Sequence, residues 1–223
     1  MNFLRKRFFE ISLWKTIVMN FRYFGISSLF YPIMLVSKNV YLDELKGSVE
    51  YLGRKKLGAV MLGFRYAGNV DPKKNRMIWR NSGIVRFYGD CRIGAGCCLS
   101  NGGLMEFGDK FHCTGRSELL CVKHIKFGKN VLISWDTTLL DSDYHNVYNI
   151  DKKDVPINED REIVIGNDCW ISCKCLILKG ITVASNTIVA AGTKLVKNQI
   201  EENNEILSDI NGIGVVIKTG VTR

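Results

Sequence analysis

Apolar residues recur at every sixth position over the stretch between residues 165 and 197. The positions are Ile165, Ile171, Ile177, Val183, Val189 and Leu195, and small residues follow several of them: Gly166, Ser172, Ala184 and Ala190. A period of six fits neither an amphipathic helix nor a strand that only alternates. It is typical of a parallel β-helix, in which each apolar residue points into a narrow interior and each small neighbour lets the chain turn a corner.

The same spacing continues upstream. Because one coil cannot bury its own apolar face, a repeat of this kind should run through much of the chain. It does so at Phe87, Ile93, Leu99, Phe107, Cys113, Leu119, Phe127, Ile133 and Leu139, with a slip of two residues before Phe107 and before Phe127. A sandwich of short strands would instead place its turns at variable intervals of roughly 8–12 residues.

The C-terminal repeats, IVIGNDCWIS and ILKGITVASNTIVAAGTKLVK, resemble the last coils of the bacterial hexapeptide-repeat acyltransferases. That family includes the maltose, galactoside and xenobiotic O-acetyltransferases. The resemblance spans about residues 87–218, and it implies that the coils are left-handed. We therefore expect an all-β core, a left-handed parallel β-helix of hexapeptide repeats, with an N-terminal helical or irregular segment and a short C-terminal segment.

The pattern divides the chain into four segments. Residues 1–40 are basic and predict an amphipathic helix, and residues 41–83 predict strands and a turn-rich loop. The β-helix is expected over residues 84–200, with a polar loop at 141–162, and a short segment follows at 201–223. The strands of 41–83 leave two alternatives open, early imperfect coils or a small separate sheet.

The surplus of positive over negative charge lies wholly in the N-terminal third. Residues 1–80 contain 15 Lys and Arg against 5 Asp and Glu, whereas the rest of the 223-residue chain contains 16 against 17. Between Phe3 and Tyr23, five basic residues alternate with six aromatic ones, but no nucleic-acid-binding motif accompanies them. We expect no nucleic-acid partner.

The run from Phe8 to Phe21 predicts an amphipathic helix. A cleaved signal peptide is not expected, because Glu10 and Lys15 interrupt the apolar run. A membrane-spanning helix is not expected either, since the apolar stretch 23–36 falls short of the ~20 residues needed and contains Pro32. Two interpretations stay open, an interfacial helix on an anionic membrane and a helical cap on the first coil.

The eight cysteines lie almost entirely within the coils. Without a secretory signal, they are expected to be reduced thiols that fill small interior or corner positions. The spacing of Cys173 and Cys175 differs from the two-residue gap of common structural zinc sites, so no metal is expected.

The repeat stops after Leu139, and the polar loop that follows is a candidate functional segment. It begins with DSDYH at residues 141–145, which resembles the segment that carries the catalytic histidine in many sugar and polysaccharide O-acetyltransferases. We expect His145 to be the general base, because a histidine pKa near ~6.5 suits removal of a hydroxyl proton at neutral pH. If the segment is extended, residues 141, 143 and 145 share one face, and Asp143 is our candidate to orient the imidazole. His112 and His124 are expected to be structural.

The resemblance further implies acetyl-CoA as the acyl donor, direct transfer in a ternary complex, and a homotrimer with CoA bound between subunits. The residues that match the family's CoA groove are Trp170, Cys173, Ala191, Gly192, Val196, Lys197 and Lys218. The family's Gly-Asn-Pro-Ala element is replaced here by Asn211-Gly-Ile-Gly214.

These features favour an O-acetyltransferase that acts on a sugar hydroxyl of a surface or capsular polysaccharide or its precursor. The alternative is an N-acetyltransferase for an amino sugar or an antibiotic, and the next is a non-catalytic scaffold. A metal hydratase of the γ-carbonic anhydrase type is disfavoured, because histidines 112, 124 and 145 include no close pair. The expected location is the cytoplasm, at the inner face of the cell membrane if residues 1–40 bind lipid.

Overall fold

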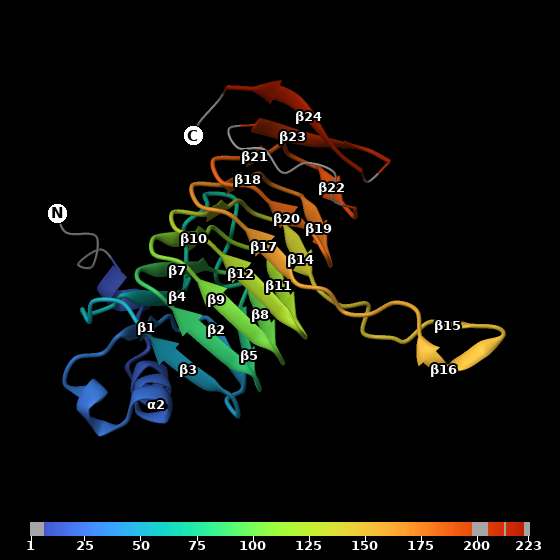
Figure 1. Cartoon of the computed structure of the whole chain (residues 1–223). Helices are drawn as coiled ribbons and strands as arrows, with labels where there is room; N and C mark the ends of the chain where they lie inside the picture. The colour runs from blue at the N-terminus through green and yellow to red at the C-terminus, as the bar shows by residue number, and fades with distance from the viewer. Residues whose placement is uncertain (1–6, 198–204, 212, 221–223) are drawn as a thin grey trace.

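A computed structural model of the chain describes residues 7–197, 205–211 and 213–220. Three sheets of parallel coil strands form the faces of a prism, and each of the first six coils contributes one strand to each sheet (Figure 1). A two-stranded hairpin projects away from the prism, and an antiparallel pair closes its C-terminal end.

The first sheet contains β1 (Met34–Val36), β4 (Val60–Phe64), β7 (Cys91–Gly94), β10 (Phe111–Cys113), β13 (Leu132–Ile133), β18 (Trp170–Ile171), β21 (Ile188–Val189), β23 (Glu205–Ile210) and β24 (Ile213–Thr219). The second contains β2 (Val40–Glu44), β5 (Met77–Asn81), β8 (Cys98–Asn101), β11 (Glu118–Cys121), β14 (Thr138–Leu140), β19 (Leu176–Leu178) and β22 (Lys194–Leu195). The third contains β3 (Ser48–Tyr51), β6 (Ile84–Phe87), β9 (Leu104–Phe107), β12 (His124–Phe127), β17 (Ile163–Ile165) and β20 (Thr182–Val183).

The residues of the six-residue repeat fill the interior of the prism. Phe87, Phe107 and Phe127 occupy equivalent positions of three successive coils, and their ring centroids stack 5.2 Å and 5.3 Å apart. Ile165 continues this column, because β17 pairs with β12 across the polar loop. All four side chains are at most 2% exposed. The predicted parallel β-helix is thus confirmed, with its apolar positions in register.

The strands between residues 34 and 83 belong to the same coils. Met34, Leu35 and Val36 pair with Val60, Met61 and Leu62, and β4 pairs in turn with β7. Of the two alternatives for residues 41–83, the described strands therefore form early coils, and the coils extend N-terminal to residue 84. The turn-rich loop at 68–75 lies between β4 and β5.

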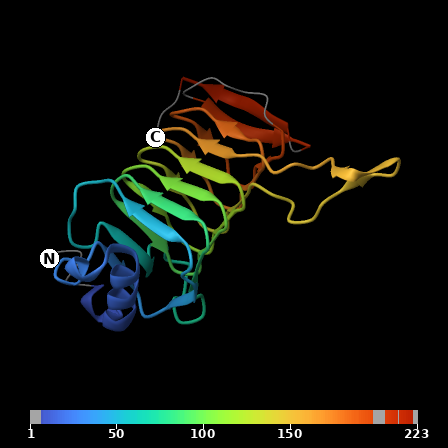
Figure 2. The same cartoon turned by 60° about the horizontal axis from the view of Figure 1, so that its bottom comes forward.

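A helical cap covers the open end of the first coil (Figure 2). It comprises η1 (Phe8–Glu10), α2 (Leu13–Phe24) and η2 (Ile26–Leu29). The prediction of one helix from residue 8 to residue 21 was wrong in its bounds, because Ser12 donates its backbone N–H to Val36 and caps α2 through its hydroxyl. In the described residues, no helix has both the length and the apolarity that a bilayer crossing requires.

All eight cysteines are free thiols, and six of them are buried in the coils. Cys97 and Cys113 lie 3.5 Å apart, Sγ to Sγ, in the interior. Burial raises the pKa of the Cys91 thiol well above its ordinary value. These thiols pack as small apolar side chains.

The aromatic column generates a stability prediction. Replacement Phe107→Ala removes the central ring between Phe87 and Phe127, and we expect it to lower the free energy of unfolding by about 3–5 kcal/mol. Phe30→Ala is the matched control, because Phe30 is 88% exposed, and its effect should stay within about 0.5 kcal/mol. Urea denaturation followed by circular dichroism measures both, and equal effects would contradict the column as a core element.

Candidate functional site

The polar loop leaves the prism between β14 and β17, at the corner that joins the second sheet to the third. Its distal part forms a hairpin of β15 (Tyr148–Asn149) and β16 (Lys152–Pro156), which projects from the prism in Figures 1 and 2. Residues 143–151 are exposed. The loop is therefore accessible to a large ligand, while its base is built into the fifth coil.

Both ends of this loop are fastened to the turn at residues 122–124 of the coil below. At its start, the buried Asp141 carboxylate accepts the backbone N–H groups of Val122, Lys123 and His124 at 2.7–2.9 Å. At its end, Lys123 Nζ donates to the Asp160 carbonyl at 3.0 Å. Asp141 is thus engaged with the backbone, which fixes where the loop begins.

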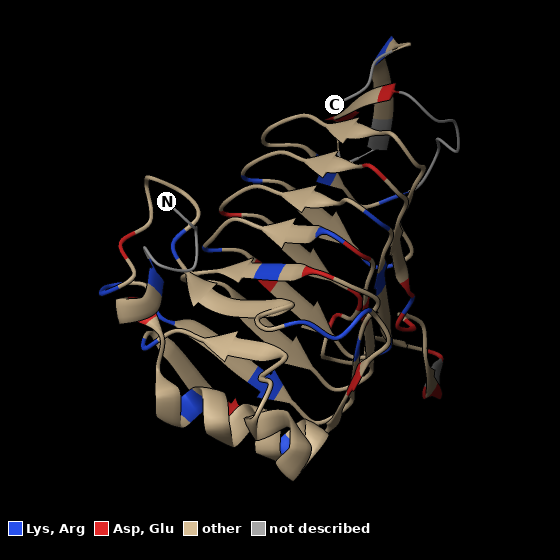
Figure 3. Ribbon diagram, turned by 90° about the vertical axis from the view of Figure 1, so that its left-hand side faces the viewer, with Lys and Arg blue, Asp and Glu red and all other residues tan. Residues whose placement is uncertain are grey.

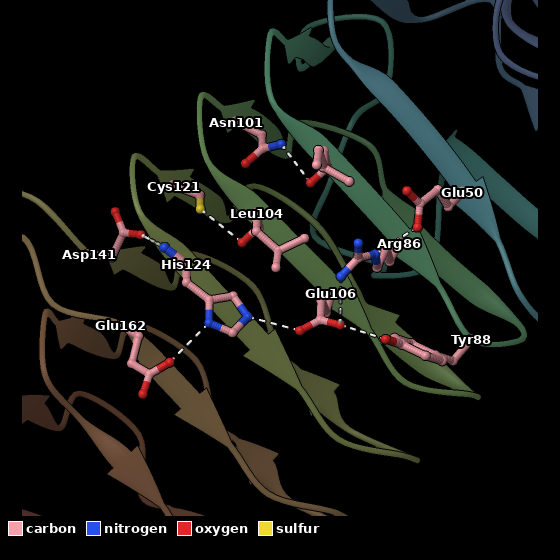
Figure 4. A network of polar contacts seen from close by, with 11 residues as sticks. Glu50, Arg86, Tyr88, Asn101, Leu104, Glu106, Cys121, His124, Asp141 and Glu162 are labelled. Carbon is pink, nitrogen blue, oxygen red and sulfur yellow. Dashed lines mark hydrogen bonds and ion pairs between the residues drawn. The ribbon is translucent and has the colours of Figure 1, made fainter.

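His124 also holds the end of the loop, through a hydrogen bond to Glu162. Its Nδ1 lies 2.9 Å from Glu162 Oε2, and its Nε2 lies 2.9 Å from Glu106 Oε2 (Figure 4). A neutral imidazole carries one N–H, so it can donate to one of these carboxylates, whereas an imidazolium donates to both. The protonated form of His124 therefore satisfies both acceptors. His124 thus joins two acidic side chains of neighbouring coils, and the sequence did not predict these partners.

The contacts of His124 continue along the third sheet. Tyr88 donates its hydroxyl to Glu106 at 2.6 Å, and Arg86 pairs with Glu50 at 2.7 Å (Figure 4). Burial alone would raise the pKa of Glu106, but the hydrogen bonds from Tyr88 and His124 outweigh burial and hold that pKa below its ordinary value. The network links side chains from β3 to the end of the loop.

His145 and Asp143 lie on the loop, but they do not form the pair that an extended segment would give. Tyr144, between them, has φ of 58°, so the backbone turns and the two side chains no longer share a face. The Asp143 carboxylate instead accepts from Lys179 Nζ at 2.6 Å and from Asn158 Nδ2 at 2.8 Å, and the Lys179 bond lowers the Asp143 pKa.

The His145 side chain is exposed, and no described residue hydrogen-bonds to its ring. Its backbone carbonyl accepts from Asn158 Nδ2 at 2.8 Å, and Asn158 Oδ1 accepts from the Val147 N–H at 2.7 Å. Asn158 therefore holds the two strands of the loop together around residue 145, while the imidazole faces solvent. The role of Asp143 in this structure is to anchor the loop to Lys179.

The residues matched to a CoA groove fall into separate places on the prism. Cys173, Ala191 and Gly192 lie in the turns between the first and second sheets of consecutive coils, where Gly192 donates its N–H to the Cys173 carbonyl at 2.9 Å. Gly192 has φ of 78° and open space where a side chain would stand. This corner could therefore accept the close approach of an extended ligand.

The other matched residues lie on different elements. Trp170 lies on β18 and donates its indole N–H to Ser134 Oγ at 3.0 Å. Val196 and Lys197 follow β22, and Lys218 lies on β24; all three are exposed. Across the described residues, no three His, Cys, Asp or Glu side chains are grouped as metal ligands would be.

One chain does not assemble these parts into a single cleft. The loop that carries His145 leaves the prism at the corner between the second and third sheets. Cys173, Ala191 and Gly192 lie at the corner between the first and second sheets. The second sheet separates the two corners. A site that combines the histidine with the open corner therefore needs a second copy of the chain.

Known family models and curated protein sequences give no match to this chain. Among solved structures, the polySia-specific acetyltransferase NeuO is similar, with a TM-score of 0.52, 18% identity, and 85% of this chain and 78% of that one covered. Two others are AntD, an N-acyltransferase from Bacillus cereus (TM-score 0.47, 14% identity, 84% and 80% covered), and the polysialic acid O-acetyltransferase OatWY (0.46, 16%, 85% and 86%).

The similarity to NeuO establishes the class of fold. The chain is a left-handed parallel β-helix, and the resemblance inferred from its hexapeptide repeats is confirmed at the level of that fold.

The Glu106 network generates a prediction for acid stability. Because the folded-state pKa of Glu106 lies below its ordinary value of 4.5, its ionised form stabilises the fold above that pH, and the stabilisation is lost as the pH falls through the lowered pKa. We expect the free energy of unfolding to fall less steeply in Glu106→Gln than in the wild type between about pH 5 and pH 3. Glu159→Gln, at an exposed position of the loop, is the control, and parallel curves for all three proteins would contradict the assignment.

Proposed function

We propose that this protein is an O-acetyltransferase that transfers an acetyl group from acetyl-CoA to a sugar hydroxyl of a surface or capsular polysaccharide or its precursor. The observation that carries the proposal is the fastened loop, which presents the exposed His145 beside a β-helix of the NeuO type. NeuO is described as specific for polysialic acid, a sugar polymer. The projecting hairpin leaves room for an acceptor of that size.

In the proposed reaction, neutral His145 accepts the proton of the acceptor hydroxyl as its oxygen attacks the thioester carbonyl carbon. The C–O bond forms, the C–S bond breaks, and the imidazolium returns the proton to the departing CoA thiolate. The exposed ring suits this role, because no described residue competes for its nitrogens. A positioned base of this kind contributes about 10²–10⁴-fold to the rate.

For the acyl donor, we assign the open corner of the sixth and seventh coils. Cys173, Ala191 and Gly192 would let the pantetheine arm lie close to the backbone, and Trp170 and Val196 would flank it. Lys197 and Lys218 offer exposed ammonium groups for the CoA phosphates. Because His145 lies at a different corner, the base of one chain would act on the donor held by its neighbour in a homotrimer. We place the enzyme in the cytoplasm, where acetyl-CoA is available.

The first test is the replacement His145→Ala. We expect kcat to fall by about 10²–10⁴-fold, while acetyl-CoA binding measured by calorimetry stays unchanged, because the donor corner is separate from the loop. Acetyl transfer is followed by thiol release with oligosaccharide acceptors that carry hydroxyl or amino groups. Transfer to amino groups alone would favour the N-acetyltransferase alternative, and absence of acetyl-CoA binding in the wild type would overturn the proposal.

The shared site predicts complementation between two inactive variants. Ala191→Trp blocks the donor corner, and His145→Ala removes the base. A mixed trimer can still hold an intact loop from one chain against an intact corner from another. We expect co-expressed variants, purified through different affinity tags, to regain a measurable fraction of wild-type activity. Each variant alone should stay inactive, and no recovery in verified mixed trimers would show that each site is built within one chain.

A further inference from the structure

The capping helix α2 packs on the first coil through a mixed face, on which two polar residues are buried beside the core residue Met19. Asn20 is fully buried, its Oδ1 accepts the Met34 N–H at 3.1 Å, and its Nδ2 donates to the Met34 carbonyl at 2.7 Å. Thr16 Oγ1 accepts the Val36 N–H at 3.1 Å. These contacts satisfy the backbone of β1, whose outer edge would otherwise be an open sheet edge. The inner face of α2 is therefore occupied by these hydrogen bonds and by the packing of Met19, which is fully buried in the hydrophobic core.

A second set of apolar residues of the cap is exposed to solvent. On α2, Leu13, Ile17 and Phe21 follow one another at intervals of four residues, and Trp14 adjoins them at 73% exposure. The exposed apolar residues of the segment are Phe8, Phe9, Leu13, Trp14, Ile17, Phe21, Ile26, Phe30 and Tyr31, which we call the apolar ridge. A concentration of exposed apolar residues in one segment indicates an interaction site, unlike single scattered residues.

Basic groups border this ridge. Lys15 Nζ donates to the carbonyls of Lys38 and Val40 at 2.6 Å, and Arg22 donates to the Lys46 carbonyl at 3.0 Å, so both charges lie between the ridge and the first coil. Glu10 is the only acidic residue between positions 7 and 31. In Figure 3, Lys and Arg positions are coloured blue on the ribbon at the helical end of the prism.

A second basic group lies beside the end of the ridge. The loop at 54–56 contributes Arg54, Lys55 and Lys56, and these line one hollow with Tyr31. Gly58 donates its N–H to the Pro32 carbonyl at 3.0 Å, which holds this loop next to the end of the ridge. Aromatic and aliphatic residues bordered by cations are the pattern of segments that insert into the interface of an anionic bilayer.

We propose that the apolar ridge docks the protein on an anionic membrane, with its side chains among the acyl chains and the basic groups at the lipid phosphates. A second copy of the chain is a poorer occupant, because end-to-end contact would bring Arg22 and the basic loop of both copies together. The helices that carry the ridge lie at the end of the prism (Figure 2), so trimers formed through the sides of the prism would leave them free. Three ridges would then face one membrane and bind with avidity.

The test is co-sedimentation of the full chain with vesicles of phosphatidylglycerol and phosphatidylcholine in equal amounts, or of phosphatidylcholine alone. We expect the wild type to pellet with the anionic vesicles and at least about ten-fold less protein to pellet with the neutral ones. The double variant Trp14→Glu with Phe21→Glu should lose at least about ten-fold in binding. The matched control, Ile210→Glu with Ile217→Glu, changes two residues that are also exposed, 63% and 58%, at the other end of the prism, and it should bind as the wild type does.

A second readout locates the contact. The fluorescence of Trp14 should shift to shorter wavelength on anionic vesicles, and Trp14→Phe should keep binding but lose the shift. Circular dichroism checks that every variant is folded. Equal binding of the ridge and control variants, or a ridge variant that changes only the oligomeric state, would overturn the proposal. Because the assay contains neither acetyl-CoA nor an acceptor, its outcome is independent of the proposed acetyl transfer.

Discussion

The in-register stacking of coils is the constraint on which the rest of this structure depends. A single coil cannot enclose its own interior, so each apolar residue is buried by the equivalent residues of the coils above and below. The pairing of β12 with β17 keeps this register across an excursion of more than a coil's length. The loop can therefore vary in length and sequence without disturbing the core, because its two ends return to adjacent positions of the same stack.

Register also decides which polar side chains meet. Glu106, His124 and Glu162 come from the third-sheet side of three successive coils, and their separations in sequence are 18 and 38 residues. Asp141 reaches the turn at 122–124 in the same way. On the outer surface of a β-helix, a side chain therefore contacts the side chains at equivalent positions of the adjacent coils. The contribution of a charged residue to stability depends on those neighbours.

The fold was predictable from the sequence because its period is carried by many residues. Phe87, Phe107, Phe127 and their equivalents each repeat the same spacing, so no single substitution hides it. The partners of His124 could be inferred only once the register of the coils was known. The expected pairing of Asp143 with His145 is absent because Tyr144 has a positive φ, which reverses the local direction of the chain. Tyrosine usually avoids this conformation, so nothing in the sequence indicated the turn.

The outward face of α2 was ambiguous for a related reason. The sequence showed the apolar periodicity of this helix. It did not show that the edge of β1 needs hydrogen-bond partners, and this need places Asn20 and Thr16 on the inward face. From sequence alone, Thr16 and Asn20 belong to the solvent side of an amphipathic helix. The cap and the lipid-facing interpretations are therefore compatible, since they concern opposite faces of one helix.

The even rise of the coils has a geometric consequence. Neighbouring strands in a sheet are about 4.8 Å apart, and the loop with His145 leaves the fifth coil, four steps from the coil that α2 covers. The loop that carries His145 thus leaves the prism about 19 Å from its helical end. If the proposed enzyme docks on a membrane by its helical end, the height of its loop above the lipid surface is set by the number of coils, and inserting or deleting one coil would change that height by about 4.8 Å.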